Sequence, residues 1–181
     1  GSTITQQLIK NVTNDKDRDA MRKLREIVRA TLITRKLTKK EILEAYLNTI
    51  SLGNGICGVQ VAANYYFNKD VSELNLTECA ALAAITKNPS RFNPVTEKGA
   101  AENKKRRQTV LDKMLELKMI SYDEYDKAYN TELKIDDSQK DEYEGEINSY
   151  FVDALIDQVI DDLAEKYNLS TQMASTMFYN G

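Results

Sequence analysis

Histidine and tryptophan are absent from the 181 residues of this chain, and there are only two prolines and seven glycines. The absence of histidine excludes a Ser-His-Asp triad, a Cys-His pair and any histidine-ligated zinc site. Acid–base chemistry would therefore have to come from Asp, Glu, Lys or Tyr. The scarcity of proline and glycine favours long helices over many short strands joined by tight turns.

The two cysteines, Cys57 and Cys79, are too few for a disulfide framework and do not have the spacing of metal ligands. We expect both to be small buried core residues, because free cysteine is among the most buried residue types. The sequence has no run of about 18 apolar residues that would predict a transmembrane helix, and its start does not resemble a signal peptide. Its length suits one domain, or one domain with a small appendage.

Charge is unevenly distributed, although the net charge is only −3. Residues 1–40 carry eleven basic and four acidic side chains, whereas residues 121–181 carry four basic and fifteen acidic ones. A basic front and an acidic rear suggest an anionic ligand or an anionic surface at the front. The alternative is that each part of the chain is simply solvated.

Helix-start signals and the spacing of apolar residues predict an all-α fold without internal repeats. We expect Ser2 to cap a first helix that runs to residue 11. In the next helix, residues 20–35, we expect Met21, Leu24 and Val28 to face the core. Further helices are predicted at residues 38–50, 59–67, 75–86, 96–118, 121–130 and 147–167. Three of these begin with capping signals, at Thr38, Asn75 and Ser121. Three glycines and an asparagine interrupt the helices at residues 51–58.

A group of cations surrounds one carboxylate in the helix at residues 20–35. Helical spacing places Arg22, Arg25, Glu26 and Arg29 on one face, and Lys10 and Arg18 extend this basic region. Hydroxyl and amide side chains near the start of the chain could add uncharged donors to a phosphate site: Ser2, Thr3, Gln6 and Gln7. From spacing alone, a solvated helix face with an Arg22–Glu26 ion pair and ordinary helix caps remains the alternative.

Two further stretches stand out. Arg106 and Arg107 form a second basic pair on a predicted helix, and Asn48 precedes a Gly-Asn-Gly turn that contains Asn54. Such a turn allows a close approach of the backbone. A solvated helix surface and a plain helix C-cap are the respective alternatives.

Four segments occur in a defined order: GSTITQQLIKN at residues 1–11, RKLRE at 22–26, KKEILEAYLN at 39–48 and RRQTVL at 106–111. They resemble the second to fifth motifs of family 51 glycosyltransferases, which read G-S-T-x-T-Q-Q, R-K-x-x-E, K-x-x-I-L-x-x-Y-L-N and R-R-x-x-V-L. This family comprises the transglycosylase domain of class A penicillin-binding proteins and the monofunctional transglycosylases. The resemblance covers residues 1–130 closely.

The resemblance implies an all-α, partly lysozyme-like transglycosylase fold with a membrane-apposed lobe. Residues 1–130 would form the glycosyltransferase domain, 131–146 an acidic surface loop and 147–181 a helical segment leading toward a transpeptidase domain. The implied reaction polymerises lipid II onto a lipid-linked glycan strand, with inversion and release of undecaprenyl pyrophosphate. It takes place at the extracytoplasmic face of the bacterial membrane, without nucleic acid. The resemblance establishes no cofactor, but it is compatible with a divalent cation, Mg²⁺ or Mn²⁺.

By the same resemblance, Lys10 and Arg18 would hold the phosphates of the donor. Glu26 would be an essential carboxylate that positions the cations or assists the leaving group. Supporting cations and residues that line the cleft would be Arg22, Lys23, Arg25, Ser2, Thr3, Gln6 and Gln7. Residues that orient the cleft as scaffold would be Lys39, Tyr46, Asn48, Asn54, Arg106 and Arg107.

The family's first motif, E-D-x-x-F-x-x-H-x-G, which supplies the general base, has no counterpart in this sequence. We therefore expect an N-terminally truncated transglycosylase, without its membrane helix, that is inactive or nearly so by itself. Loss of a general base typically costs on the order of 10²–10⁴ in rate. The alternative function is a non-catalytic helical module that binds an anionic partner through its basic N-terminal face. Such a module would bind in a strongly salt-dependent way and would not depend on Glu26.

Overall fold

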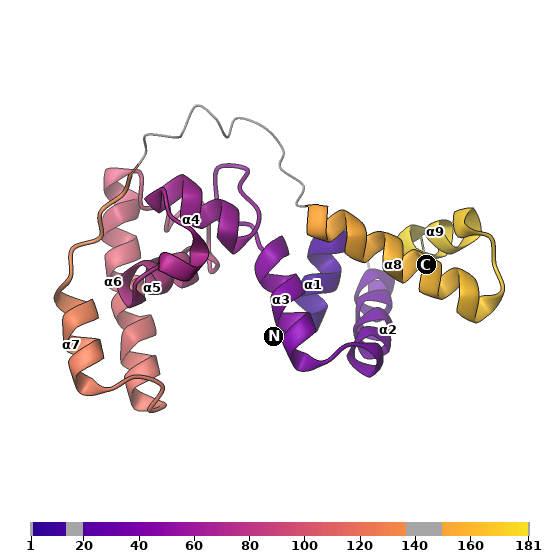
Figure 1. The fold of residues 1–181 in the computed structure, drawn as a ribbon, viewed down its shortest axis with the longest axis horizontal. Helices are drawn as coiled ribbons and strands as arrows, with labels where there is room; N and C mark the ends of the chain where they lie inside the picture. The colour runs from indigo at the N-terminus through magenta and orange to yellow at the C-terminus, as the bar shows by residue number, and fades with distance from the viewer. Residues whose placement is uncertain (1, 14–19, 137–149, 181) are drawn as a thin grey trace. The chain divides into compact units, whose positions relative to one another are not determined.

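The computed structural model describes residues 2–13, 20–136 and 150–180, and the chain divides into two compact units (Figure 1). The first unit contains Gly1–Ile50 and Asn148–Gly181, and the second contains Ser51–Ile147. Within the described ranges the regular elements are helices, with one isolated antiparallel bridge between Ser51 and Cys57. The predicted all-α fold is confirmed. None of the helices in these ranges combines the length and the hydropathy that a membrane span requires.

The first unit is built from helices of both chain ends: α1 (Ile4–Thr13), α2 (Ala20–Lys36), α3 (Lys39–Thr49), α8 (Tyr150–Tyr167) and α9 (Thr171–Asn180). Helix α1 packs against α2 and α3, and α8 packs against α3 and α9. The last helices therefore belong with the first fifty residues, a division that differs from the predicted segment boundaries.

Two apolar clusters lie among the described residues of this unit. One contains buried Leu8, Ile42 and Ala45, and the other contains buried Ile160, Ala174 and Phe178. Val12 of α1 packs against both clusters, so it connects the helices from the two chain ends. Helix α9 was not predicted. It begins after Ser170, whose Oγ accepts a hydrogen bond from the Met173 backbone N–H at 3.2 Å.

The cap of α1 is Thr3, and the prediction of Ser2 was wrong. The backbone N–H of Gln6 donates to Thr3 Oγ1, and the Thr3 backbone N–H donates to Gln6 Oε1, both at 3.2 Å. This reciprocal pair satisfies two donors at the helix start. The Ser2 side chain instead accepts a hydrogen bond from Lys23.

Helix α2 buries a different face from the predicted one. Met21, Leu24 and Val28 are 56%, 53% and 51% exposed, whereas Glu26 and Ala30 are buried. Glu26 and Ala30 lie four residues apart, so they share one face of the helix. The charged face turns inward because the Glu26 carboxylate finds cationic partners there.

The second unit contains α4 (Val59–Phe67), the short 3-10 helix η1 (Val71–Glu73), α5 (Leu76–Ile85), α6 (Glu97–Glu116) and α7 (Tyr122–Asn130). Capping boxes at Asn75 and Ser121, like the one at Thr38 in the first unit, confirm the predicted helix starts. Helix α5 packs against α6, and Ala80, Leu111 and Ala128 form a buried cluster between α5, α6 and α7.

The glycine-rich turn at residues 51–58 is packed against α4. Gly53 has φ +92°, and a Cβ atom there would lie 3.2 Å from the hydroxyl of buried Tyr66. The Tyr66 hydroxyl donates to the Leu52 carbonyl oxygen at 2.7 Å. Only a residue without a side chain combines this backbone conformation with this contact.

The prediction that both cysteines are buried was wrong. Cys57 is half-buried and Cys79 is exposed. Helix α5 buries Ala80, Ala81 and Ala84, and Cys79 lies with Ala83 on the opposite, exposed stripe. For Cys79, its position on the helix decided its exposure, rather than the average tendency of its residue type.

Candidate functional site

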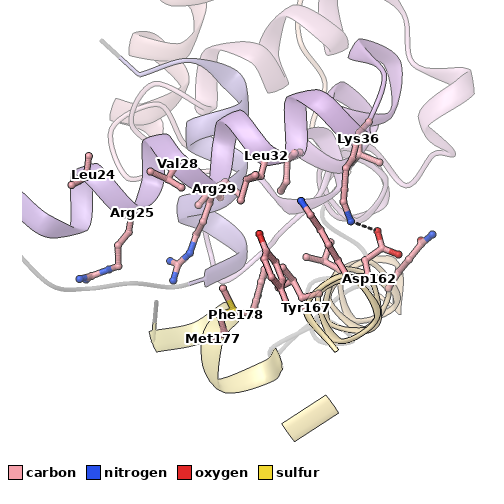
Figure 2. Close-up of a pocket in the computed structure, with 17 residues that line it drawn as sticks. Leu24, Arg25, Val28, Arg29, Leu32, Lys36, Asp162, Tyr167, Met177 and Phe178 are labelled. Atoms are coloured by element: carbon pink, nitrogen blue, oxygen red, sulfur yellow. Dashed lines mark hydrogen bonds and ion pairs between the residues drawn. The ribbon is translucent and has the colours of Figure 1, made fainter. Parts of the chain in front are cut away.

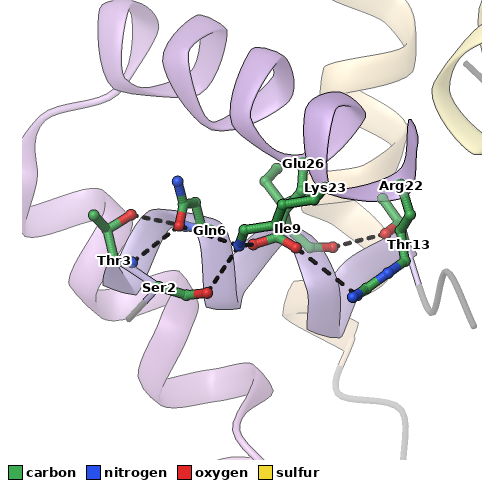
Figure 3. Close-up of polar contacts among 8 residues, drawn as sticks. All are labelled: Ser2, Thr3, Gln6, Ile9, Thr13, Arg22, Lys23 and Glu26. Atoms are coloured by element: carbon green, nitrogen blue, oxygen red, sulfur yellow. Dashed lines mark hydrogen bonds and ion pairs between the residues drawn. The ribbon is translucent and has the colours of Figure 1, made fainter. Parts of the chain in front are cut away.

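Lys23 is the centre of a polar cluster formed where α1 and α2 meet (Figure 3). Its Nζ donates to Ser2 Oγ at 2.9 Å, Gln6 Oε1 at 3.4 Å and Glu26 Oε1 at 2.6 Å. An ammonium group has three N–H donors, so these three acceptors account for all of them. Lys23 therefore links the chain start, α1 and α2.

Glu26 is the buried carboxylate of this cluster and is only 6% exposed. Besides Lys23, the Arg22 guanidinium approaches it, with Nη1 3.9 Å from Oε2. A buried carboxylate is stable only when it is paired and hydrogen-bonded, and these cations meet that requirement.

A small cavity of about 10 Å³ lies beside Glu26. Its polar lining comes from both helices: Lys10, Thr13, Arg22, Glu26 and Arg29. Such a volume holds roughly one water molecule. The cavity thus brings together the predicted Lys10, Arg22 and Glu26, and larger ligands would have to lie at its surface, where Lys10 is exposed.

Helical spacing explains why these side chains meet. Gln6, Lys10 and Thr13 follow one another on α1 by steps of four and three, and Arg22, Glu26 and Arg29 have the same spacing on α2; Ser2 lies just before α1. Residues at such steps share one face of a helix. The two faces lie against each other because α1 packs on α2.

Arg25 does not line the cavity beside Glu26, although the helix wheel had placed it on the same face. It lines an apolar groove of about 370 Å³ between α2 and the helices α8 and α9 (Figure 2). Leu24, Val28 and Leu32 face this groove from α2, and Tyr167, Met177 and Phe178 face it from α8 and α9. This groove is where the exposed apolar face of α2 lies.

Cations surround the apolar groove. Arg25, Arg29, Lys36 and Lys166 line it. Among its described lining residues the acidic side chain is Asp162, whose Oδ2 lies 2.6 Å from Lys36 Nζ. Arg29 also lines the cavity beside Glu26, so one side chain connects the two features. An apolar groove with a basic lining can accommodate an amphiphilic anion.

The remaining described residues that were predicted for the site in the first unit lie elsewhere on its helices. Gln7 is exposed on α1, Lys39 is exposed at the start of α3, and Arg18 lies outside the described residues. The Asn48 side chain donates to the Glu44 carbonyl oxygen at 3.0 Å, a contact within α3. Tyr46 is half-buried, and this burial raises the pKa of its phenol.

The other three predicted scaffold residues belong to the second unit. Asn54 adopts a left-handed backbone conformation (φ +52°) and donates to the Tyr65 hydroxyl at 3.0 Å. It also accepts a hydrogen bond from Asn93 Nδ2 at 3.0 Å. Arg106 is half-buried on α6, and Arg107 is buried on the same helix. The hydrogen bonds of Asn54 connect the glycine-rich turn with Tyr65 of α4 and with Asn93, and the scaffold role of Arg106 and Arg107 stays a prediction.

A divalent cation does not fit the cluster at Glu26. The Lys23 ammonium already lies 2.6 Å from its carboxylate, and Lys10, Arg22 and Arg29 line the adjoining cavity. Mg²⁺ and Mn²⁺ prefer several oxygen ligands, and four neighbouring cations would repel them. Across the described ranges, acidic and cysteine side chains form no group of three suited to a metal ion.

The sequence did not reveal the central position of Lys23 or the groove. The Lys23–Glu26 pair could have been found from its i,i+3 spacing. The groove could not, because α9 was not predicted and its Met177 and Phe178 are far from α2 in sequence.

These features define the class: an all-helical protein in which basic side chains gather around one buried carboxylate, beside an apolar groove. The chain belongs to the transglycosylase family, whose model, described as "Transglycosylase", matches residues 1–115. It is 38% identical over 170 residues to penicillin-binding protein 1F of Bacillus subtilis, covering 94% of this chain and 23% of that protein. It is 41% identical over 165 residues to penicillin-binding protein 1A of Aquifex aeolicus, covering 91% and 22%.

The fold also resembles a solved relative, the crystal structure of penicillin-binding protein 1A from Haemophilus influenzae. The TM-score is 0.51 at 28% identity, covering 89% of this chain and 20% of that chain. The chain therefore spans less than a quarter of the length of these relatives. The predicted family is confirmed, and it supports a glycosyltransferase function in peptidoglycan synthesis.

Proposed function

We propose that this chain forms the donor side of a peptidoglycan glycosyltransferase, which acts on lipid II and a lipid-linked glycan strand at the membrane surface. The observation that carries the proposal is the buried Glu26 held among Lys10, Arg22 and Lys23 in a member of the transglycosylase family. Fixed cations are what the departure of a pyrophosphate requires.

The cations divide into two roles. The three N–H donors of Lys23 are taken by Ser2, Gln6 and Glu26, so Lys23 holds the cluster together. Lys10 is exposed at the cavity and is available to the pyrophosphate of the donor. Arg22, fixed by Glu26, adds a guanidinium that suits phosphate oxygens.

In the proposed reaction, the 4-hydroxyl of the incoming lipid II attacks the anomeric carbon of the donor with inversion. The bond from that carbon to the pyrophosphate oxygen breaks, and its electron pair leaves with the pyrophosphate. The hydroxyl proton passes to a base that this cluster does not provide, because Lys23 and Arg22 hold the carboxylate of Glu26. We therefore expect the 181-residue chain by itself to bind the donor but to polymerise it slowly at most.

The apolar groove would take the first part of the donor's lipid chain. Leu24 and Val28 expose apolar surface there, and Arg29 lines both the groove and the cavity beside Glu26. A lipid whose chain lies in the groove would thus carry its phosphates toward Lys10. Burial of each methylene contributes about 0.8 kcal/mol.

Calorimetric titration with a disaccharide-pyrophosphate donor that carries a farnesyl chain tests this function. Lys10→Ala should weaken binding at least about tenfold, because it removes a charge-assisted contact. Lys40→Ala, which removes an exposed lysine of α3, is the matched control and should bind as the wild type does. Equal binding by Lys10→Ala would refute the phosphate site.

Two further arms separate the parts of the proposal. Val28→Glu should weaken the binding of the farnesyl donor but not the binding of the same donor without its farnesyl chain, because the substitution changes only the groove. Binding that falls steeply with salt and ignores Glu26→Ala would instead support the non-catalytic anion-binding module.

A further inference from the structure

The second unit has a cavity of its own, with a volume of about 460 Å³. Helix α6 contributes Lys104, Arg107 and Gln108, and the chain that follows α7 contributes residues 131–133 and 135. The volume is within the range of sites that hold small ligands. The proposed glycosyltransferase function does not use this cavity.

Arg107 is a buried cation on the wall of this cavity and is only 3% exposed. Its Nη2 donates to the Thr131 carbonyl oxygen at a long 3.4 Å, and its Nε is buried without a hydrogen-bond partner among the residues that the structure describes. None of the described carboxylates forms an ion pair with it, although Glu132 lines the same cavity. Burial also lowers the pKa of Arg107.

A buried guanidinium without a counter-ion is costly, because the charge has lost its hydration and gained no opposite charge. A guanidinium presents five donors that match a carboxylate in a two-bond fork. The long bond to Thr131 uses one of them. The remaining donors therefore suit an anion that enters the cavity.

The neighbouring side chains favour a single negative charge over a phosphate. Lys104 lies one turn before Arg107 and Gln108, on the same side of α6, and is exposed. Glu132 brings a negative charge to the same cavity. Arg107 and Lys104 carry two positive charges, and Glu132 cancels one of them. The remaining single positive charge balances one carboxylate better than a doubly charged phosphate.

The backbone of the segment that follows α7 can form hydrogen bonds with an extended peptide. It leaves α7 with Thr131 in extended conformation (φ −74°, ψ 128°). Within the described part of the chain, the backbone groups of Glu132, Leu133, Lys134 and Ile135 form no hydrogen bond with another residue. Free backbone donors and acceptors in an extended segment can pair with a peptide as in a β-ladder. Leu133, Ile135 and Tyr129 add apolar surface to the same cavity.

We propose that this cavity binds a short extended peptide whose C-terminal carboxylate pairs with Arg107. The peptide backbone pairs with residues 132–135, and its apolar side chains contact Tyr129, Leu133 and Ile135. The proposal is independent of the donor site in the first unit, and its test measures binding rather than polymerisation.

The test uses the full 181-residue chain and the probe Ac-Val-Ala-Val-Ala with a free carboxylate, followed by calorimetry or by NMR shifts of the α6 amides. The same peptide with a C-terminal amide should bind at least about tenfold more weakly, because it cannot form the charge-assisted pair. Equal binding of the acid and the amide would overturn the proposal. Equal binding of Ac-Val-Glu-Val-Ala-NH₂ would overturn the choice of the C-terminal carboxylate.

Variants place the site on α6. Arg107→Lys keeps the charge but loses the fork, so we expect acid binding to weaken several-fold with little change in amide binding. Lys104→Met, at an exposed position, should also weaken acid binding, and it keeps the test valid if Arg107→Lys perturbs folding. Lys105→Met, on the same helix but outside the cavity, should have no effect. Displacement of the peptide by inorganic phosphate at a lower concentration than acetate would also overturn the proposal.

Discussion

The Lys23–Glu26 ion pair gives the sharpest test of how the first unit is built. Lys23 Nζ lies 2.6 Å from Glu26 Oε1, and the side chains are 41% and 7% exposed, respectively. Breaking a fully buried pair by removing one partner costs about 3–5 kcal/mol, whereas an exposed pair contributes about 0.2–1 kcal/mol. Because one partner is buried and the other is partly hydrated, we expect Glu26→Gln to lower the free energy of unfolding by about 2 kcal/mol.

A double-mutant cycle separates the pair from the loss of each side chain. Urea unfolding followed by circular dichroism is measured for Glu26→Gln, Lys23→Met and the double variant. We expect a coupling energy of about 1–2 kcal/mol between the two positions, because each loses its main partner when the other is replaced.

The matched control is the Lys113–Glu116 pair on α6. It has the same i,i+3 spacing and the same 2.6 Å separation, but its side chains are 61% and 65% exposed. Its coupling energy should be about 0.3 kcal/mol, typical of an exposed helix pair. A Lys23–Glu26 coupling energy no larger than that of Lys113–Glu116 would refute the claim that burial of Glu26 strengthens its ion pair with Lys23.

Three further predictions concern stability and titration. Gly53→Ala should lower the unfolding free energy by about 1–2 kcal/mol, because its φ is +92° and the new Cβ would lie 3.2 Å from the Tyr66 hydroxyl. Gly55→Ala should cost less in the same urea titration, because its φ is +76° and no atom of the described residues lies within 4 Å of the new Cβ. The side-chain and backbone hydrogen bonds from Thr38 lower the pKa of Glu41 below its usual 4.5. The contribution of this capping box to stability is therefore present above that pH and is lost as the pH falls through the lowered pKa. Acid unfolding of Glu41→Gln should accordingly depend less on pH than that of the wild type. The Tyr125 hydroxyl donates a hydrogen bond to Asp112 of α6, which raises the pKa of Tyr125 to about 12. The stabilising effect of this bond is complete below about pH 10 and is lost as the pH rises toward 12. Tyr125→Phe should therefore remove one late-titrating phenol from the alkaline absorbance titration, and an unchanged titration would contradict this.

The helices could be predicted largely from local signals. A capping box needs only a hydroxyl or amide residue and a glutamate three positions later, and this spacing correctly located the starts of α3, α5 and α7 at Thr38, Asn75 and Ser121. Local signals alone do not distinguish Ser2 from Thr3 as the cap of the first helix, because adjacent hydroxyl residues offer the same signal. The position of Gln6, three residues after Thr3, makes the reciprocal bonds possible.

The sequence by itself determined the all-helical architecture, the turn at the 51–58 glycines and the identity of the residues that could form a phosphate site. Those features depend on hydrogen bonds and backbone conformations within a few residues.

Tertiary structure alone decided which face of α2 is buried. The helix has one apolar face, with Leu24 and Val28, and one charged face, with Glu26. Burial of the charged face is stable only because Ser2 and Gln6, from a distant part of the chain, hold Lys23 beside that carboxylate. The same long-range packing leaves the apolar face open as a groove beside α8 and α9, since the helices that line it come from opposite ends of the sequence.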